Sequence, residues 1–187
     1  YEEAQAISMS ETFIDDVFIL FNNTQKVVSS RGNMTSELFY NLYYKSDEFS
    51  YEDFRDYLGQ FHYGDMIPLK LDSGKEVFLF TMGTLKSTFR ESPAVVCCQI
   101  SAETIKNRLQ QMKWSDTMDV MLLTEQNVRV SANDMITGDI DWNYDQWEKG
   151  SHSQKNKVNE EYIVSVLPSE VLRWKYLSVL PVDQMKN

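Results

Sequence analysis

The stretches "VFILFNNTQKVVSS" (17–30) and "VMLLTEQNVRVS" (120–131) share one pattern. Each begins with four or five apolar residues, passes through a polar turn rich in Asn, Gln or Thr, and resumes with Val-rich alternation before a Ser. Alternating apolar runs on either side of a polar turn are typical of a β-hairpin. The two starts are 120 − 17 = 103 positions apart, about the length of one small domain. We therefore expect two modules, each of which opens with a hairpin.

Two segments after the first hairpin change to a helical period. "TSELFYNLYY" (35–44) has apolar residues three and four positions apart, with Thr35 or Ser36 as the N-cap. "SYEDFRDYLGQ" (50–60) repeats this pattern, with Ser50 as the cap. A hydroxyl side chain before an apolar stripe is a start signal for a helix. The sequence therefore predicts two helices between the first hairpin and the next strands.

Two later runs in the first module predict the centre of a sheet. "VFLFTMG" (77–83) and "AVVCCQI" (94–100) are apolar on both faces instead of alternating, which is typical of strands that are covered on both sides. The following segment, 101–112, has the pattern of a helix that leaves the sheet. Good helix formers in 1–14 also predict a short helix before the first hairpin.

The second half of the chain repeats this order in a shorter form. The hairpin at 119–131 is followed by a polar and aromatic stretch, 132–157, and then by apolar runs at 161–168 and 174–181. Each of these two runs ends in Pro, which usually stands where a strand ends. The polar segment 151–159 is the best candidate for a mobile surface loop.

Composition and charge exclude several classes of protein. The chain has 187 residues, 42% hydrophobic and 13% aromatic, which is enough apolar material for a core. Its formal charge of −10 and its pI near 4.7 argue against nucleic-acid binding through this segment. The apolar runs are far shorter than the roughly 20 residues of a membrane span. The first residue is Tyr and no leader pattern follows, so we expect a segment of a longer protein.

Chemistry-bearing motifs are scarce, and the sequence predicts neither an enzyme nor a cofactor. There is no nucleophile elbow and no zinc-protease motif. The two histidines, His62 and His152, fall in predicted loops and are interpreted as surface turn residues. The adjacent Cys97 and Cys98 would point to opposite faces of a strand, so they are interpreted as two small apolar side chains and not as a disulfide.

One acidic string has the spacing of a calcium loop. In "DIDWNYDQWEKG" (139–150), oxygen-bearing side chains recur at every second position up to Asp145. The string departs from the calcium pattern at Tyr144, where Gly is required, and at Gly150, where Glu is required. An acidic loop that caps a helix is the interpretation we favour over a calcium site, and we predict no metal.

Four stretches together resemble a known family: 13–32, 36–44, 67–68 and 162–181. They are similar to the extracellular double Cache region of bacterial transmembrane receptors, in particular membrane-anchored AraC-type regulators and sensor histidine kinases. The resemblance implies a mixed α/β (α+β) fold of two tandem PAS-like modules. Each would be an antiparallel sheet of about five strands, with helices between strands two and three. The modules would be membrane-distal, 11–114, and membrane-proximal and smaller, 115–187.

The family resemblance also implies a function. The chain would be the extracellular part of a bacterial cell-membrane receptor, which senses a small ligand or a partner and relays the signal to a kinase or transcriptional output. Membrane helices would lie outside the segment, and the full receptor would form a homodimer.

The amino-acid-binding subgroup of this family has a Tyr, Arg, Trp and Asp constellation. The stretch "YEDFRDY" (51–57) supplies Tyr51 and Arg55 but no Trp, so amino-acid recognition is not carried over. The alternatives are an extracellular binding or adhesion module without signalling, and a small hydrolase.

The candidate ligand site is an aromatic layer in the first module. Aromatic side chains with polar tips suit a small-ligand pocket, although such residues at helical spacing are also the usual content of a core. Arg31, at the end of the first hairpin, would supply charge for an anionic ligand or be an exposed turn residue. The remaining candidates are three helix residues, three residues of a strand expected beneath that helix, and one further hairpin-end cation: Tyr40, Tyr43, Tyr44, Phe78, Phe80, Met82 and Arg90.

Overall fold

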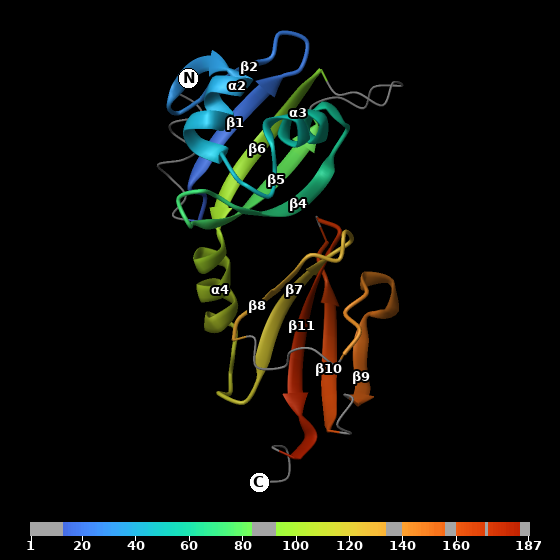
Figure 1. Ribbon diagram of the computed structural model, residues 1–187. Helices are drawn as coiled ribbons and strands as arrows, with labels where there is room; N and C mark the ends of the chain where they lie inside the picture. Colours follow the sequence, from blue (N-terminus) through green and yellow to red (C-terminus); the bar gives the residue numbers. More distant parts are fainter. Residues whose placement is uncertain (1–12, 84–92, 134–139, 156–159, 171, 184–187) are drawn as a thin grey trace. The chain divides into compact units, whose positions relative to one another are not determined.

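The protein contains two antiparallel sheets with few helices, as a computed structural model of residues 13–83, 93–133, 140–155, 160–170 and 172–183 shows (Figure 1). The chain divides into two compact units, residues 1–102 and 103–187. The predicted module boundary, between 114 and 115, falls later in the chain. Within the described residues, no helix is long and apolar enough to span a membrane.

Unit 1 is built on a six-stranded sheet with the order β3-β2-β1-β6-β5-β4. The strands are β1 (Asp16–Phe21), β2 (Lys26–Ser29), β3 (Gly32–Thr35), β4 (Tyr63–Lys70), β5 (Glu76–Gly83) and β6 (Ala94–Ser101). The predicted first hairpin is confirmed as β1 and β2, and the two runs that are apolar on both faces form the interior strands β5 and β6. Without β3, the order is that of a PAS-like sheet, in which the first strand pairs with the last.

The two outermost strands of unit 1 were not predicted individually. β3 adds a sixth strand beside the expected five, and its four residues lack an apolar run. β4 contains Pro68, which cannot donate a backbone hydrogen bond and therefore argues against a central strand. The edge position of β4 makes Pro68 acceptable, because its partner β5 lies on one side only.

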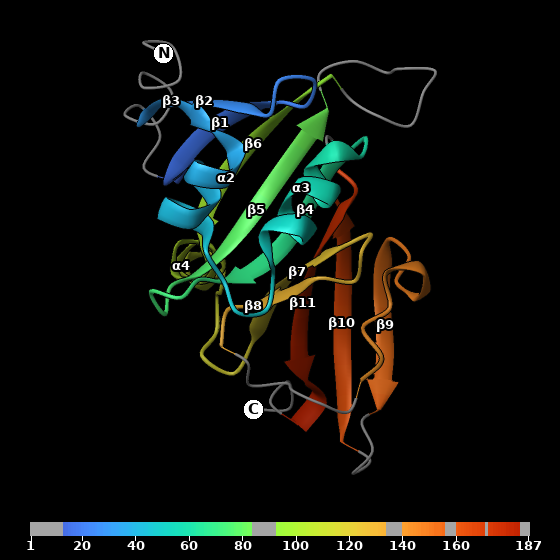
Figure 2. The same cartoon turned by 45° about the horizontal axis from the view of Figure 1, so that its top comes forward.

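Helices cover one face of the first sheet, as Figure 2 shows. The predicted aromatic helix begins after Thr35, whose side chain accepts from the Leu38 amide. It runs as α2 (Ser36–Phe39) and continues as a π-helix, η1 (Tyr40–Tyr44). Ser50 caps α3 (Tyr51–Gly59) in a reciprocal capping box with Asp53. The hydrogen bonds from Ser50 hold the pKa of the Asp53 carboxyl below its usual value.

Unit 2 repeats the same strand order with five strands, β8-β7-β11-β10-β9. It contains α4 (Ala102–Gln111), β7 (Asp119–Thr124), β8 (Arg129–Ser131), η2 (Tyr144–Gln146), β9 (Gly150–Lys155), β10 (Glu161–Pro168) and β11 (Trp174–Pro181). The second hairpin and both Pro-terminated strands are confirmed. In each sheet the opening hairpin strand pairs with the final strand, so the repeated sequence pattern corresponds to a repeated topology.

The prediction of a mobile loop at 151–159 is wrong for residues 151–155. Residues 150–155 form strand β9, which pairs with β10 over its whole length. This strand lies at the sheet edge, and none of its side chains is buried, so it has no apolar face that the sequence could reveal. Residues 156–159 lie outside the described part of the chain.

Each sheet has its own core, and the two cores differ in what covers the strands. In unit 1 the core joins strand residues to the aromatic rings of α2, η1 and α3. In unit 2 the described covering residues come from the segment 140–149, where Ile140 and Trp147 pack on strand residues and Trp142 and Tyr144 flank them. The single short helix that the described residues place between β8 and β9 is η2, so helices are far less prominent there than we expected.

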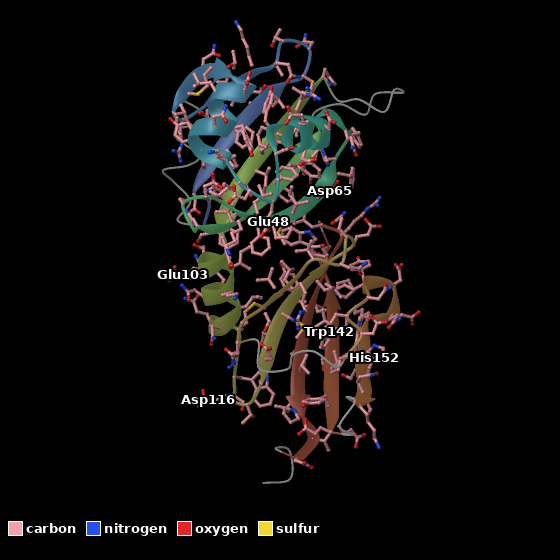
Figure 3. All side chains as sticks on the ribbon, in the orientation of Figure 1. Glu48, Asp65, Glu103, Asp116, Trp142 and His152 are labelled. Carbon is pink, nitrogen blue, oxygen red and sulfur yellow. The ribbon has the colours of Figure 1, made fainter. Side chains whose placement is uncertain are left out.

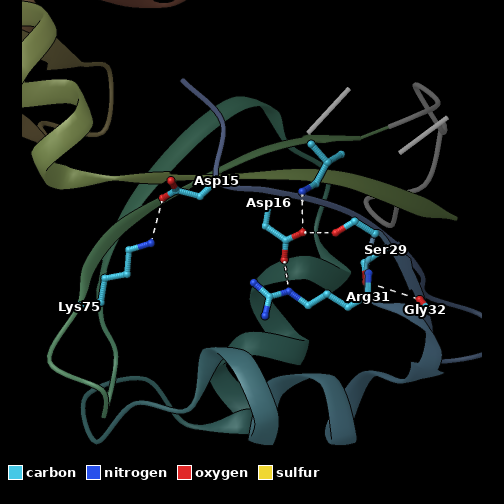
Figure 4. A network of polar contacts seen from close by, with 8 residues as sticks. Asp15, Asp16, Ser29, Arg31, Gly32 and Lys75 are labelled. Atoms are coloured by element: carbon cyan, nitrogen blue, oxygen red, sulfur yellow. Dashed lines mark hydrogen bonds and ion pairs between the residues drawn. The ribbon is translucent and has the colours of Figure 1, made fainter. Parts of the chain in front are cut away.

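A buried carboxylate ties the first hairpin together (Figure 4). Asp16, which is 1% exposed, begins β1. Its two oxygens accept from the Ser30 hydroxyl at 3.1 Å, the Val17 amide at 3.0 Å and Nε of Arg31 at 3.1 Å. The Arg31 guanidinium lies 4.2 Å from the centre of the Tyr43 ring. Arg31 therefore neutralises a buried charge and fixes the end of the hairpin to the helical layer.

Replacing Arg31 by Met keeps the aliphatic stem and removes the guanidinium. Asp16 would then be a buried carboxylate without its cation, and we expect the free energy of unfolding to fall by about 1–3 kcal/mol. Because the Arg31 side chain is 40% exposed, the loss should stay below the roughly 3–5 kcal/mol of a fully buried pair. Urea unfolding measures this change. Arg55→Met, which removes an exposed pair with Asp56, is the control; equal stability of the two variants would contradict the role of Arg31.

Candidate functional site

The layer between the helices and the first sheet is dense in aromatic rings. Phe18 of β1 is fully buried, and its ring centre lies 4.8 Å from that of Phe39, 5.3 Å from Tyr44 and 6.3 Å from Phe54. Tyr40 continues the layer, with its ring centre 5.5 Å from that of Phe54. These separations fall in the range of favourable ring contacts. The helical candidates thus lie together, inside a packed core.

The three helical tyrosines differ in what their hydroxyl groups do. Tyr40 is 4% exposed, and its hydroxyl donates to the Phe49 carbonyl at 2.6 Å. Tyr43 is half-buried beneath the Arg31 guanidinium. Tyr44 is fully buried, and its hydroxyl has no hydrogen-bond partner among the described residues. Burial, and after it the charge of Asp16, raise the pKa of Tyr44 well above its usual value.

The expectation that Phe78, Phe80 and Met82 lie beneath the helices is wrong. Their neighbours Val77 and Leu79 belong to the helix-covered core, and alternation places the other three side chains on the opposite face of β5. Phe78 is buried there, Phe80 is half-buried and Met82 is 45% exposed. A strand that is apolar on both faces has no polar side to indicate its orientation, which is why the sequence allowed the wrong face.

Arg90 lies outside the described residues. Arg31, the other candidate cation, is paired with Asp16, so it is neither an unpaired ligand contact nor an unattached turn residue.

Tyr51 and Arg55, the two matches to the amino-acid constellation, do not lie together in one site. The Tyr51 hydroxyl lies 2.8 Å from the Ser36 hydroxyl, inside the layer, whereas Arg55 is exposed and pairs with Asp56.

A polar cluster that the sequence did not predict lies between the end of α3 and strands β4 and β5. His62, interpreted above as a surface turn residue, is 2% exposed. Its Nδ1 lies 2.8 Å from a carboxylate oxygen of Asp65, and its Nε2 lies 2.6 Å from the backbone carbonyl of Tyr57. The Tyr57 hydroxyl in turn lies 3.0 Å from the Thr81 hydroxyl. Burial raises the pKa of Tyr57, so its phenol stays neutral.

A glycine and a bulge bring Asp65 to His62. Gly64 has a φ of 80°, which a residue with a side chain rarely adopts. The pairing of β4 with β5 shifts by one residue between Tyr63 and Asp65. Bulges often redirect a side chain beside a functional site. Asp65, labelled in Figure 3, belongs to β4, and the three-residue spacing to His62 carries no recognisable motif, so the sequence did not reveal the pair.

This cluster is built to hold elements together. Both ring nitrogens of His62 face acceptors, the Asp65 carboxylate and the Tyr57 carbonyl, so neither nitrogen is directed at a hydroxyl or thiol that could act as a nucleophile. The Thr81 hydroxyl faces Tyr57 and the Asp65 carbonyl, not the imidazole. The described residues thus give His62 a structural environment and not the geometry of a nucleophile and its base.

A depression of about 320 Å³ opens at the end of unit 1 where β4 turns into β5. Its volume lies at the lower end of the range for small-ligand sites. Glu48, labelled in Figure 3, and Lys70 and Glu76 bring charge to its rim. The other lining residues are mainly apolar: Pro68, Leu69, Val77, Phe78 and Ala102. Leu69 and Val77 also belong to the helix-covered core, so the depression borders the aromatic layer.

The acidic string of unit 2 caps a short helix. The Asn143 side chain accepts from the Asp145 amide at 3.1 Å at the start of η2. Asp141 accepts from the Asn143 amide and from the Gln146 side chain. Asp139, the first residue of the string, lies outside the described residues, and the described ones contain no group of three acidic, His or Cys side chains fit for a metal. The capping interpretation accounts for the described side chains.

Comparison with known proteins finds likeness in fold. No protein-family model matches the chain, and no curated protein matches it in sequence. The extracellular domain of the proposed histidine kinase rpHK1S-Z16 has a TM-score of 0.61 and 12% identity, over 100% of this chain and 78% of that one. The ligand-binding domain of Pseudomonas fluorescens chemoreceptor CtaA, in complex with L-alanine, has a TM-score of 0.56 and 14% identity, over 96% and 77%.

A second chemoreceptor gives the same result. The ligand-binding domain of Campylobacter jejuni Tlp3, in complex with 4-methylisoleucine, has a TM-score of 0.52 and 14% identity, over 98% of this chain and 71% of that one. At such identities the likeness concerns the fold. The chain therefore has the fold of extracellular sensor and ligand-binding domains of histidine kinases and chemoreceptors.

Replacing Tyr57 by Phe removes the hydroxyl that contacts Thr81 and leaves the ring against His62. We expect a loss of about 0.5–1.5 kcal/mol in the free energy of unfolding, since the Thr81 hydroxyl is buried and loses this partner. Thr81→Val should cost a similar amount. The double variant should cost less than the sum of the two, as denaturant unfolding of all four proteins can measure. Additive losses would show that the two hydroxyls do not interact.

Proposed function

We propose that this chain is the extracellular ligand-sensing region of a bacterial transmembrane receptor, of the double Cache type. The observation that carries the proposal is the fold itself, which the chain shares over nearly its whole length with extracellular domains of histidine kinases and chemoreceptors. The repeated strand order of the two sheets supports a tandem origin. In this proposal the membrane-distal module, predicted at 11–114, is assigned to unit 1, and the smaller membrane-proximal module, predicted at 115–187, is assigned to unit 2.

The ligand site that we propose is the helix-covered layer of unit 1. Tyr40, Tyr43 and Tyr44 line it from η1, and the Tyr44 hydroxyl is a buried polar group that a ligand could pair with. A buried hydroxyl without a partner costs free energy in the unliganded protein. A ligand that supplies an acceptor or a donor there removes this cost, which favours binding.

The chemistry of the layer favours a small molecule with an apolar body and at least one polar group. Aromatic rings supply the apolar wall, and Tyr44 and the Tyr57–Thr81 pair supply hydroxyls within it. CtaA and Tlp3 were crystallised with L-alanine and 4-methylisoleucine, which supports ligands of this size. The stretch 51–57 contains no Trp, and the Arg55 side chain is exposed. We therefore propose contacts that differ from those of the amino-acid constellation described above.

The mechanism that we propose is a shift between two arrangements of the helices over the sheet. Because the rings fill the layer in the present arrangement, a ligand would favour one in which α2, η1 or α3 stands further from β1. Strand β6 pairs with β1 and runs without a break into α4. The side chain of Gln110 in α4 donates to the Ala132 carbonyl next to β8. This chain of contacts is the route that we propose for the signal.

Membrane helices outside the segment, a homodimer of the full receptor, and a kinase or transcriptional output complete the proposal. They rest on the fold and on the resemblance in sequence. The protein acts in this proposal by binding and not by catalysis, because the buried His62 is engaged at both nitrogens.

The alternative, an adhesion module, would use exposed aromatic residues. The described aromatic side chains are mostly buried or half-buried, and the most exposed, Tyr63 and Trp114, belong to different units.

The proposal is tested by a thermal-shift screen against amino acids, carboxylates, sugars and nucleobases. A ligand that binds the folded form alone raises the melting temperature, by an amount set by its concentration relative to the dissociation constant. We expect one chemical class to raise it. Tyr44→Phe should leave the unliganded protein at least as stable as the wild type, because it removes a buried hydroxyl without a partner. It should weaken binding by about three- to tenfold, the usual cost of one hydrogen bond.

Tyr144→Phe, in unit 2, is the matched control and should bind as the wild type does, as titration calorimetry can measure. If Tyr144→Phe weakens binding and Tyr44→Phe does not, the site lies elsewhere than in the layer of unit 1.

A further inference from the structure

The depression at the end of unit 1 lies apart from the tyrosines of the proposed ligand layer. It has a volume of about 320 Å³ and opens where β4 ends at Lys70 and β5 begins at Glu76. Its floor includes four apolar residues that are each 7% exposed or less: Leu69, Val77, Phe78 and Ala102. The side chains of Glu48, Lys70 and Glu76 are exposed at its rim. An apolar floor beneath a few charged groups is the usual composition of a small-ligand site.

The rim carries more negative than positive charge. Glu48 and Glu76 contribute two carboxylates, and Lys70 contributes one ammonium group. Lys70 stands opposite Glu76 in the register of β4 and β5, yet none of these three side chains forms an ion pair within the described part of the chain. A smaller depression of about 210 Å³ shares Glu48 and Lys70 and adds Asp47. The unpaired charges therefore favour a cation.

Two further lysines belong to the segments that carry the glutamates, and both are already paired. Lys45, at the start of the loop that contains Glu48, lies 3.5 Å from a carboxylate oxygen of Asp72. Lys75, which directly precedes Glu76, lies 3.1 Å from a carboxylate oxygen of Asp15, the pair drawn in Figure 4. Neither lysine is therefore left to neutralise the carboxylates at the rim.

Hydrogen bonds hold the loop that carries Glu48. The Tyr40 hydroxyl donates to the Phe49 carbonyl at 2.6 Å and accepts from the Ser46 amide at 3.3 Å. The Glu48 amide donates to the Ser46 hydroxyl at 3.2 Å. A backbone hydrogen bond of 2.9 Å also joins this loop to the turn between β4 and β5. A rim that is fixed before binding loses less conformational entropy when a ligand binds.

We propose that this depression is a second ligand site of unit 1, which binds a small organic amine. The ammonium group of the ligand pairs with Glu48 and Glu76, and its apolar body covers Phe78 and the rest of the floor. Opposite charges attract, and the removal of apolar surface from water adds to the affinity. Lys70 repels the ammonium group and so limits the affinity. The site does not use the tyrosines of the layer, so its test is independent of the proposed function.

Three probes separate the contribution of charge from that of the apolar body. 2-Phenylethylamine has both at neutral pH, 2-phenylethanol has the body without the charge, and ethylamine has the charge with little body. In ¹H–¹⁵N NMR titrations of the whole chain, we expect 2-phenylethylamine to bind most tightly and to shift the amide signals of 48, 69–70 and 76–78. Added salt should weaken its binding, because the carboxylates are exposed. Equal affinity for 2-phenylethanol, or shifts confined to other residues, would overturn the proposal.

Variants of the rim should change the affinity for 2-phenylethylamine in opposite directions. Glu48→Gln and Glu76→Gln should each weaken binding by about two- to fivefold, the range of an exposed ion pair. Lys70→Met removes the like charge and should strengthen binding by a similar factor. Glu52→Gln changes the net charge as the glutamate variants do, but it alters an exposed residue of α3 that does not line the depression. It should bind as the wild type does. Equal dissociation constants of Glu48→Gln and Glu52→Gln would contradict the proposed site.

Discussion

The burial of Phe18 against three aromatic rings of the helical segment is the contact on which the architecture of unit 1 depends. Phe18 lies on β1, whose neighbours in the sheet are β2 and β6. The rings that surround it come from α2, η1 and α3. A single side chain thus joins the middle of the sheet to all three helical pieces. Because a ring of this size buries 150–250 Å², any motion of the helices must break or rearrange these contacts.

The two units use one topology for different packing. Each sheet pairs its first strand with its last, but the described covering of the first is helical and aromatic, and that of the second is the segment 140–149 with Trp142 stacked on Trp147 at 5.3 Å. Helices that pack as one layer can shift together over a sheet. An irregular segment that is held by its own capping hydrogen bonds has fewer conformations open to it. This difference supports the proposal that unit 1 senses the ligand and that unit 2 relays the signal.

The sequence predicted the parts of the fold that local patterns determine. Both hairpins, the Thr35 and Ser50 caps and the interior strands follow from residues that are neighbours in the chain. The edge strand β9 was missed because it buries no side chain, and β4 because it contains Pro. The face of β5 was wrong because both of its faces are apolar. His62 could not be recognised from sequence, since its partners are a backbone carbonyl and a carboxylate turned by a bulge.

The central claim is that a ligand acts on the helix-covered layer of unit 1. Hydrogen–deuterium exchange of the whole chain, with and without the compound that raises its melting temperature most, tests this claim most directly. The account predicts that exchange changes in 36–59 and in the facing strands β1 and β5, with smaller changes along β6 and α4. Changes confined to unit 2, with the exchange of 36–59 unaltered, would contradict it.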